Sequence, residues 1–103
     1  MEQLAGRVAV VMGAAQGIEW ATAERLVAEG CKVVITDRQE SVIEIASAMG
    51  AAGHVGDVAD AHHVRSVVDA TVAAYGTVDI MVSNAGCTET HREHSPLAER
   101  IAR

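Results

Sequence analysis

The sequence predicts an α/β domain in which short parallel strands alternate with amphipathic helices. Short apolar runs rich in Val and Ile alternate with longer stretches of helical apolar periodicity, and glycines stand at the boundaries between them. Half of the 103 residues (50%) are apolar, yet Trp20 and Tyr75 are the only aromatic residues. Such an aliphatic composition suits a parallel sheet that helices cover on both faces. A chain of this length has room for one small domain.

Four short apolar runs are predicted to be strands. In chain order they are Arg7–Met12, Lys32–Thr36, the weaker His54–Val55 and Asp79–Ser83. Because a helical segment separates each strand from the next, the strands are expected to be parallel and joined by right-handed crossovers. The simplest arrangement is a four-stranded sheet in the spatial order 3-2-1-4, which is half of a doubly wound sheet.

The first predicted helix follows a short glycine-containing link and runs from Gly17 to Glu29. Gly30 is well placed to end it, because glycine readily adopts the left-handed conformation common after a helix. Its apolar positions, which recur with roughly helical spacing, are Ile18, Ala21, Leu26 and Val27.

Two further helices are predicted between the later strands. Ser41 is expected to cap a helix through Met49, which Gly50 ends. Its expected inner face consists of Val42, Ile45 and Ala46. The next helix is predicted over Ala61–Tyr75 and ends at Gly76. Its expected apolar stripe consists of Val64, Val67, Val68 and Val72.

The last part of the chain differs in character. Residues 87–94 have no apolar periodicity, whereas Ser95 and Pro96 suit a helix start and Leu97 and Ile101 would share one face. We therefore expect residues 1–103 to form a single truncated domain, in which residues 87–103 are either a partial helix or a poorly packed tail.

Composition excludes several classes of partner. The net charge is −6, with acidic residues scattered along the chain, which argues against nucleic acid or an anionic membrane as partner. No apolar run reaches the ~18 residues of a membrane span, and the first residues lack the pattern of a signal peptide. Cys31 and Cys87 form neither a disulfide framework nor a Cys-x-x-Cys pair. Cys87, His91 and His94 could ligate zinc together with Glu93 or His54, but their spacing fits no standard zinc site. We expect a cytoplasmic location and no metal site.

The link after the first strand, Gly13-Ala-Ala-Gln-Gly17, is a candidate phosphate-binding turn. Two glycines permit a tight turn and a close approach of the backbone, so that amide groups and a helix N-terminus can hold a pyrophosphate. The alternative is that both glycines serve the turn alone and bind no ligand.

Acidic residues follow the second and third strands. Asp37 ends the second strand, where a carboxylate can accept hydrogen bonds from a ribose diol. The same carboxylate would repel a 2′-phosphate, which favours NAD over NADP, although the adjacent Arg38 leaves NADP as an alternative. Asp57 is placed to accept from the adenine amino group while Val58 covers the ring. For both acids the alternative is an ordinary loop residue.

Residues Asn84, Ala85 and Gly86 close the fourth strand, which would lie beside the first. Ligands of open α/β sheets bind at this point, where the strand order reverses.

Together these motifs resemble the short-chain dehydrogenase/reductase family. Its signatures are Thr-Gly-x-x-x-Gly-x-Gly, an acid ending the second strand, Asp-Val after the third and Asn-Asn-Ala-Gly after the fourth. The resemblance covers about residues 5–86 and implies a Rossmann-like half domain that binds NAD. It implies that the cofactor-binding residues are Gly13, Gln16, Gly17 and Ile18 at the pyrophosphate, Asp37 at the ribose, Asp57 and Val58 at adenine, and Asn84, Ala85 and Gly86 near the nicotinamide sugar.

The chain departs from the family pattern at three positions. Met12 replaces the first Thr, Ser83 replaces the first Asn, and Glu19 replaces the third glycine. Glu19 has the largest expected effect, because its carboxylate would lie near the pyrophosphate. At ~5 Å and an effective dielectric constant of ~20, each charge pair costs roughly 3 kcal/mol. That repulsion corresponds to about a hundredfold weaker binding, and less where water screens the charges. If the Glu19 side chain turns away from the pyrophosphate, its cost is mostly steric.

No residue matches the family's catalytic Ser and Tyr-x-x-x-Lys. Tyr75 is followed by Gly-Thr-Val-Asp79, and Lys32 is the only lysine. The sequence therefore predicts the NAD(H)-binding part of an oxidoreductase that transfers hydride between alcohol and ketone, inactive by itself. Two alternatives stay open: a non-catalytic module that binds an adenine nucleotide, and a fragment that needs a partner chain. In the second, the exposed edge of the fourth strand would drive self-association.

Overall fold

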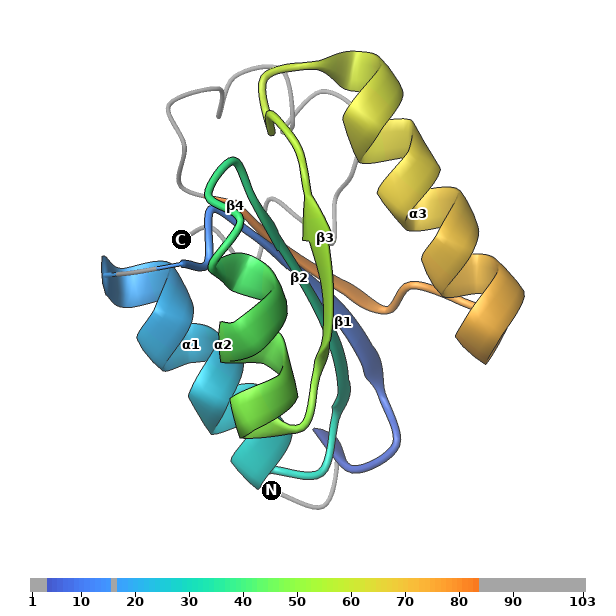
Figure 1. The fold of residues 1–103 in the computed structure, drawn as a ribbon. Coiled ribbons are helices and arrows are strands. Elements are labelled where there is room, and N and C mark those ends of the chain that lie inside the picture. Colours follow the sequence, from blue (N-terminus) through green and yellow to red (C-terminus); the bar gives the residue numbers. More distant parts are fainter. Residues whose placement is uncertain (1–3, 16, 84–103) are drawn as a thin grey trace.

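The structure is a computed structural model that describes residues 4–15 and 17–83. These residues form one four-stranded sheet with helices on both faces (Figure 1). The elements in chain order are β1 (Val8–Met12), α1 (Gly17–Ala28), β2 (Lys32–Asp37), α2 (Val42–Met49), β3 (Ala52–Val55), α3 (Ala61–Tyr75) and β4 (Ile80–Ser83). The predicted tail, residues 87–103, lies outside the described residues.

The strands run in the order β3-β2-β1-β4, and every neighbouring pair is parallel, which confirms the predicted topology. The register aligns Met12 with Thr36 on one side and with Ser83 on the other. Asp37, one residue further along β2, aligns with Val55 at the end of β3. The carboxyl ends of all four strands therefore meet at one edge of the sheet, where the candidate site residues were predicted to gather.

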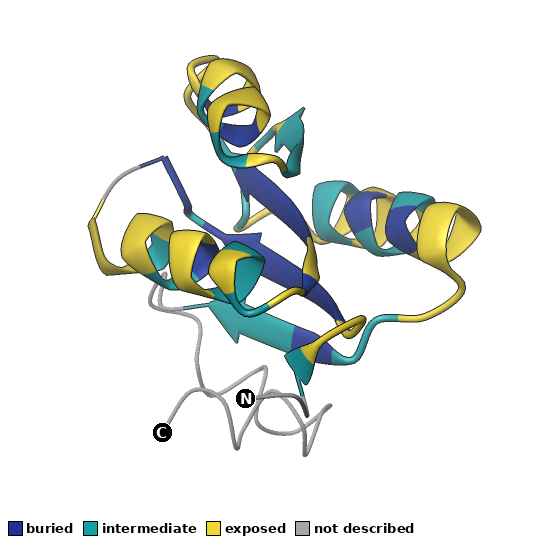
Figure 2. Cartoon of the chain, turned by 90° about the horizontal axis from the view of Figure 1, so that it is seen from below, coloured by how far each residue is buried: buried dark blue, intermediate teal, exposed yellow. Residues whose placement is uncertain are grey.

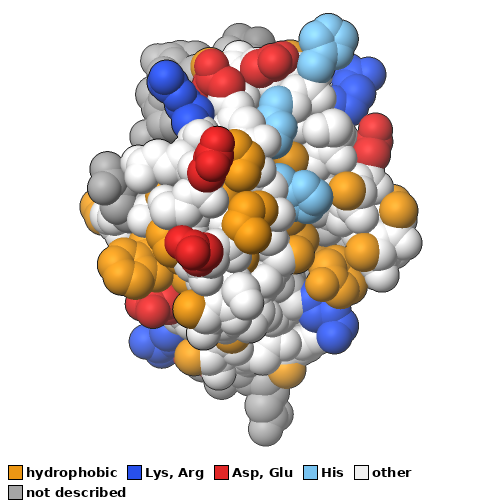
Figure 3. Space-filling model, viewed as in Figure 1, with side chains coloured by type: hydrophobic (Ala, Val, Ile, Leu, Met, Phe, Trp, Pro, Cys, Tyr) orange, Lys and Arg blue, Asp and Glu red, His pale blue; other side chains and the backbone are white. Residues whose placement is uncertain are grey.

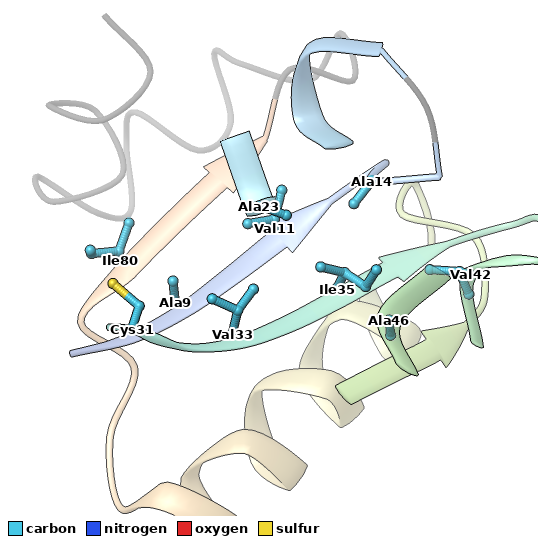
Figure 4. Close-up of a cluster of buried hydrophobic side chains, with 10 residues drawn as sticks. All are labelled: Ala9, Val11, Ala14, Ala23, Cys31, Val33, Ile35, Val42, Ala46 and Ile80. Carbon is cyan, nitrogen blue, oxygen red and sulfur yellow. The ribbon is translucent and has the colours of Figure 1, made fainter. Parts of the chain in front are cut away.

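Helices α1 and α2 cover one face of the sheet, and α3 covers the other (Figures 1 and 2). The alternation of side chains along each strand divides the core between these faces. Figure 4 shows the larger cluster, in which Val11 and Ile35 of the strands pack with Ala23 of α1 and with Val42 and Ala46 of α2. The cluster toward α3 is built on Val10, Met12, Val34 and Val67.

The apolar positions of α1 do not all face the core. Ile18 is 69% exposed and Ala21 is also exposed, whereas Ala23 is fully buried. Leu26 and Val27 pack against the core. The first turn of α1 therefore leaves its apolar side chains outside the packed layer, and only the later part of the helix lies against the sheet.

The inner face of α3 includes a polar residue that the apolar pattern missed. Val67 and Thr71 are buried, while Val72 is 43% exposed, so the prediction for Val72 was wrong. The hydroxyl of Thr71 donates to the carbonyl oxygen of Val67 at 2.7 Å, which satisfies its polar atom inside the layer. Val64 and Val68 are half-buried.

The start of α2 also differs from expectation. Ser41 precedes the helix, but its backbone is already helical (φ −59°, ψ −15°) and its side chain makes no capping hydrogen bond. The prediction of a serine cap was therefore wrong. At the other end, Gly50 takes the left-handed conformation (φ 86°) and ends the helix as predicted.

Candidate nucleotide-binding site

The turn after β1 has the open backbone expected of a phosphate-binding turn. Gly13 and Gly17 both have φ of +77°, a conformation that side chains with a Cβ rarely adopt. A Cβ built on either glycine would meet no atom of the described residues within 4 Å, so this part of the chain leaves the space beside both glycines open. Gln16, also predicted for this site, lies outside the described residues.

Three backbone amides of this turn are already bonded to the end of β2. Gly13 N and Ala14 N donate to the carbonyl oxygen of Thr36 at 2.8 and 3.2 Å. Ala15 N donates to Asp37 Oδ2 at 3.0 Å. An anion at this turn would therefore be held by the amides that begin α1, from Gly17 onward, rather than by that of Gly13.

Asp37 keeps its carboxylate at the edge of the sheet through two backbone donors. Oδ2 accepts from Ala15 N and Oδ1 accepts from Gln39 N, each at 3.0 Å. An ionised carboxylate has about four acceptor positions, so both oxygens keep capacity for further donors. The side chain is half-buried, and its contact with a ribose diol stays a prediction.

The residues after β3 form a tight turn beside Asp37. Gly56 N donates to the carbonyl oxygen of Asp37 at 2.9 Å. Asp57 is exposed, and its Oδ1 accepts from Ala59 N at 2.8 Å, so part of the carboxylate stabilises its own turn. Val58 is half-buried and packs against the core cluster beneath α3. Contact of Asp57 and Val58 with adenine stays a prediction.

His63, which is not among the predicted site residues, also belongs to this edge. The Nε2 atom of His63, in the first turns of α3, lies 2.6 Å from Thr36 Oγ1. The imidazole also lies against Gly56. Figure 3 shows histidine side chains gathered over β3 and the start of α3. A sequence signal existed, since His63, Val67 and Thr71 recur every four residues on the inner face of the helix.

Glu19 is the acidic residue in the first turn of α1, next to the predicted phosphate-binding turn. Its side chain is half-buried. Within residues 4–15 and 17–83, its carboxylate has no hydrogen bond or ion pair that would neutralise it. Glu19 therefore places a negative charge in the first turn of α1, beside the turn predicted to bind the pyrophosphate.

The nicotinamide end of the predicted site, Asn84, Ala85 and Gly86, lies outside the described residues. Among those described, no three His, Cys, Asp or Glu side chains are grouped so as to hold a metal ion. Over the same part of the chain, no helix is both long and apolar enough to cross a membrane.

A parallel sheet in this order, with a glycine turn after β1 and an acid ending β2, defines a Rossmann-type nucleotide-binding domain. The model of the short chain dehydrogenase family matches residues 7–103, so the chain belongs to that family. The resemblance inferred from the sequence motifs is thereby confirmed.

Individual relatives support the same assignment. Cis-4-hydroxycyclohexanecarboxylate dehydrogenase of Sinomonas cyclohexanicum is 43% identical over 93 residues, covering 85% of this chain and 37% of that protein. (+)-Borneol dehydrogenase 1 of Salvia officinalis is 43% identical over 96 residues, covering 85% of this chain and 35% of its own. The crystal structure of a short chain dehydrogenase from Mycobacterium smegmatis superposes with a TM-score of 0.75 at 32% identity, covering 84% of this chain and 39% of that one. The chain thus spans little more than a third of the length of these relatives.

Proposed function

We propose that this chain binds NAD(H) and forms the cofactor-binding part of an oxidoreductase that interconverts an alcohol and a ketone. The observation that carries the proposal is the Asp37 carboxylate, which is bonded to Ala15 N of the glycine turn and retains free acceptor positions. The cofactor would supply the hydride chemistry, while Asp37 would bind the adenosine ribose and the amides beginning α1 the pyrophosphate. Relatives named as dehydrogenases support the reaction class.

The preference for NAD over NADP follows from charge. A 2′-phosphate placed at the ribose hydroxyls would lie against the Asp37 carboxylate, and two negative groups in contact repel each other. Arg38 is exposed at the next position, and its positive charge would favour a phosphate there.

We further propose that the chain alone has no dehydrogenase activity. The family reaction needs a tyrosine to transfer a proton and a lysine to lower its pKa. Lys32 is the only lysine in the sequence, and Tyr75 is the only tyrosine. The Lys32 ammonium lies over the Tyr75 ring, 5.9 Å from its centroid. However, Lys32 begins β2 whereas Asp37 ends it, so this pair lies about 16 Å along the strand from the nucleotide site.

The test is a titration of the purified chain with NADH, NADPH and ADP-ribose, followed by fluorescence and calorimetry, with a turnover assay on a secondary alcohol. We expect binding of NADH and ADP-ribose that is tighter than binding of NADPH, and no turnover. Equal affinity for NADPH would contradict the role of Asp37. Turnover of NAD in proportion to protein would contradict the proposed inactivity.

A second candidate function is a non-catalytic module that senses or sequesters an adenine nucleotide. The observation that favours it is that backbone hydrogen bonds hold the carboxylates of Asp37 and Asp57, the two acids proposed to bind adenosine. ADP or ATP binding as tight as that of NADH would support this function, because nothing would then be gained from the nicotinamide half. A strong preference for NADH would exclude it.

Self-association is a further proposal that concerns β4. In the described sheet β4 pairs with β1, and no other strand of residues 4–15 and 17–83 pairs with its second edge. A second copy or a partner chain would cover this edge. Sedimentation over a range of concentrations tests the point: dimerisation supports it, and a monomer at high concentration contradicts it.

A further inference from the structure

The hydrogen bond between His63 and Thr36 joins α3 to the strand that carries the nucleotide-binding acid. His63 Nε2 and Thr36 Oγ1 are 2.6 Å apart, and Thr36 has no exposed surface (0%). A hydroxyl this deeply buried needs a hydrogen-bond partner to offset its desolvation. The imidazole of His63 supplies that partner from α3, the helix that covers this face of the sheet.

Thr36 and Asp37 form the junction of three strand ends. The Thr36 carbonyl holds Gly13 N and Ala14 N, and the Asp37 carboxylate holds Ala15 N. The Asp37 carbonyl in turn holds Gly56 N at the end of β3. A side chain that fixes Thr36 therefore fixes the glycine turn and the ribose-binding acid relative to each other.

Gly56 lies directly against the imidazole ring of His63. Its φ is not positive, so the backbone conformation does not require glycine there. Instead, a Cβ at Gly56 would collide with the ring atoms of His63. The absence of a side chain at Gly56 thus makes room for the ring that bonds Thr36.

From this geometry we infer that His63 is a positioning residue for the nucleotide site, acting through Thr36 on the glycine turn and on Asp37. The inference rests on the proposed function for its ligand, NAD(H), but the placement of the turn by His63 can be tested without any nucleotide. His63 itself does not touch the proposed binding groups of the ligand.

The first experiment compares His63→Ala, His63→Gln and the neighbouring His62→Ala. His62 is exposed and serves as the matched control. Loss of one buried hydrogen bond is expected to weaken NADH binding about fivefold to tenfold in His63→Ala. The glutamine amide can reach the same hydroxyl, so His63→Gln should restore most of the affinity. Equal affinity in His63→Ala and the control, or no rescue by glutamine, would overturn the inference.

The second experiment measures amide hydrogen exchange in the chain without nucleotide. We expect Gly13, Ala14 and Ala15 to exchange several-fold faster in His63→Ala. The amide of Asp79, bonded to Val8 O at 2.8 Å, serves as a reporter of general stability and should change less. Unchanged turn amides, or an equal change at Asp79, would overturn the inference. If the turn responds but the wild-type chain binds no NADH, the proposed function fails and the placement of the turn by His63 stands.

The third experiment uses Gly56→Ala, in which the added methyl group must displace the ring. This variant should weaken NADH binding and speed exchange at the turn as His63→Ala does. In the double variant Gly56→Ala/His63→Ala, the effects should not add, because the ring is already absent. Additive effects on turn exchange would show that Gly56 and His63 act independently, and would overturn the inference.

Discussion

Asp37 accepts a hydrogen bond from Ala15 N at 3.0 Å, across 22 positions of the sequence. The carboxylate proposed to bind the ribose therefore also closes the turn proposed to lie beside the pyrophosphate. The two parts of a nucleotide site are linked through one side chain, so a change at Asp37 is expected to act on both.

Substitution of Asp37 tests this double role. Asp37→Asn keeps one acceptor oxygen but loses the charge, and Asp37→Ala loses both. Because hydrogen bonds to charged groups contribute about 1.5–3 kcal/mol each, NADH affinity is expected to fall about tenfold in the first variant and about a hundredfold in the second. The preference for NADH over NADPH should largely disappear in both. Titration with each nucleotide checks this, with the exposed Asp69→Asn as control.

A retained preference for NADH in Asp37→Ala would contradict the assignment of cofactor selectivity to this carboxylate. Loss of affinity with unchanged selectivity would show that Asp37 acts on the turn alone.

Removal of the Glu19 charge is expected to strengthen nucleotide binding. At ~5 Å and a dielectric constant of ~20 the repulsion of a phosphate is roughly 3 kcal/mol, and water around a half-exposed carboxylate reduces it. We therefore expect Glu19→Gln to bind NADH about tenfold more tightly, and Glu19→Gly at least as tightly. Glu24→Gln, an exposed position of the same helix, is the control for a general change of charge. Equal gains in Glu19→Gln and Glu24→Gln would refute a local role for Glu19.

The order of the strands and the ends of the helices could be predicted because they depend on local signals. The alternation of β-branched runs with helical periodicity fixes a parallel sheet, since parallel strands require crossover connections. Gly30, Gly50 and Gly76 all have positive φ at the ends of helices, as their positions in the sequence predicted. Such features need no knowledge of distant contacts.

Burial of polar groups could not be predicted from the same signals. Thr71 and Thr36 are both buried, and each has a partner for its hydroxyl. Thr71 donates to a carbonyl of its own helix, and Thr36 bonds His63. A pattern of apolar residues does not predict the burial of threonines, and on α3 it favoured Val72 for the buried stripe instead of Thr71. Likewise, the sequence assigned Asp37 to a ribose, while its bond to Ala15 depends on two strand ends meeting in space.

The packing of β3 against α2 predicts a destabilising substitution. A Cβ at Gly53 would lie 2.9 Å from Ala46 Cβ and 2.9 Å from the carbonyl oxygen of Val42. The carbonyl belongs to the helix backbone and cannot move independently. Gly53→Ala is therefore expected to lower the free energy of unfolding by about 1–3 kcal/mol, measured by denaturant titration. Ser47→Ala, exposed on α2, should change it by less than about 0.5 kcal/mol. A stability of Gly53→Ala equal to that control would contradict the close packing.

The thiol of Cys31 predicts both slow alkylation and a dependence of stability on pH. Cys31 is 8% exposed, and its thiol donates to Leu4 O at 3.3 Å. Burial, followed by the nearby Glu29 charge, raises the pKa of Cys31 above its ordinary value of 9.0. Because the thiolate is the reactive form, iodoacetamide should modify the native chain far more slowly than the chain in urea. A Cys87→Ser background restricts the measurement to this thiol.

The pH dependence follows from the same raised pKa. Above pH 9.0 the unfolded chain loses the Cys31 proton while the folded chain still holds it, so the unfolded state is favoured increasingly. The stabilising contribution is complete below pH 9.0 and is lost as the pH rises toward the folded pKa. In the Cys87→Ser background, the free energy of unfolding should therefore fall more steeply above pH 9.0 than in the same chain with Cys31→Ala. Parallel curves for the two chains, or equally fast alkylation with and without urea, would show that Cys31 is not shielded in the fold.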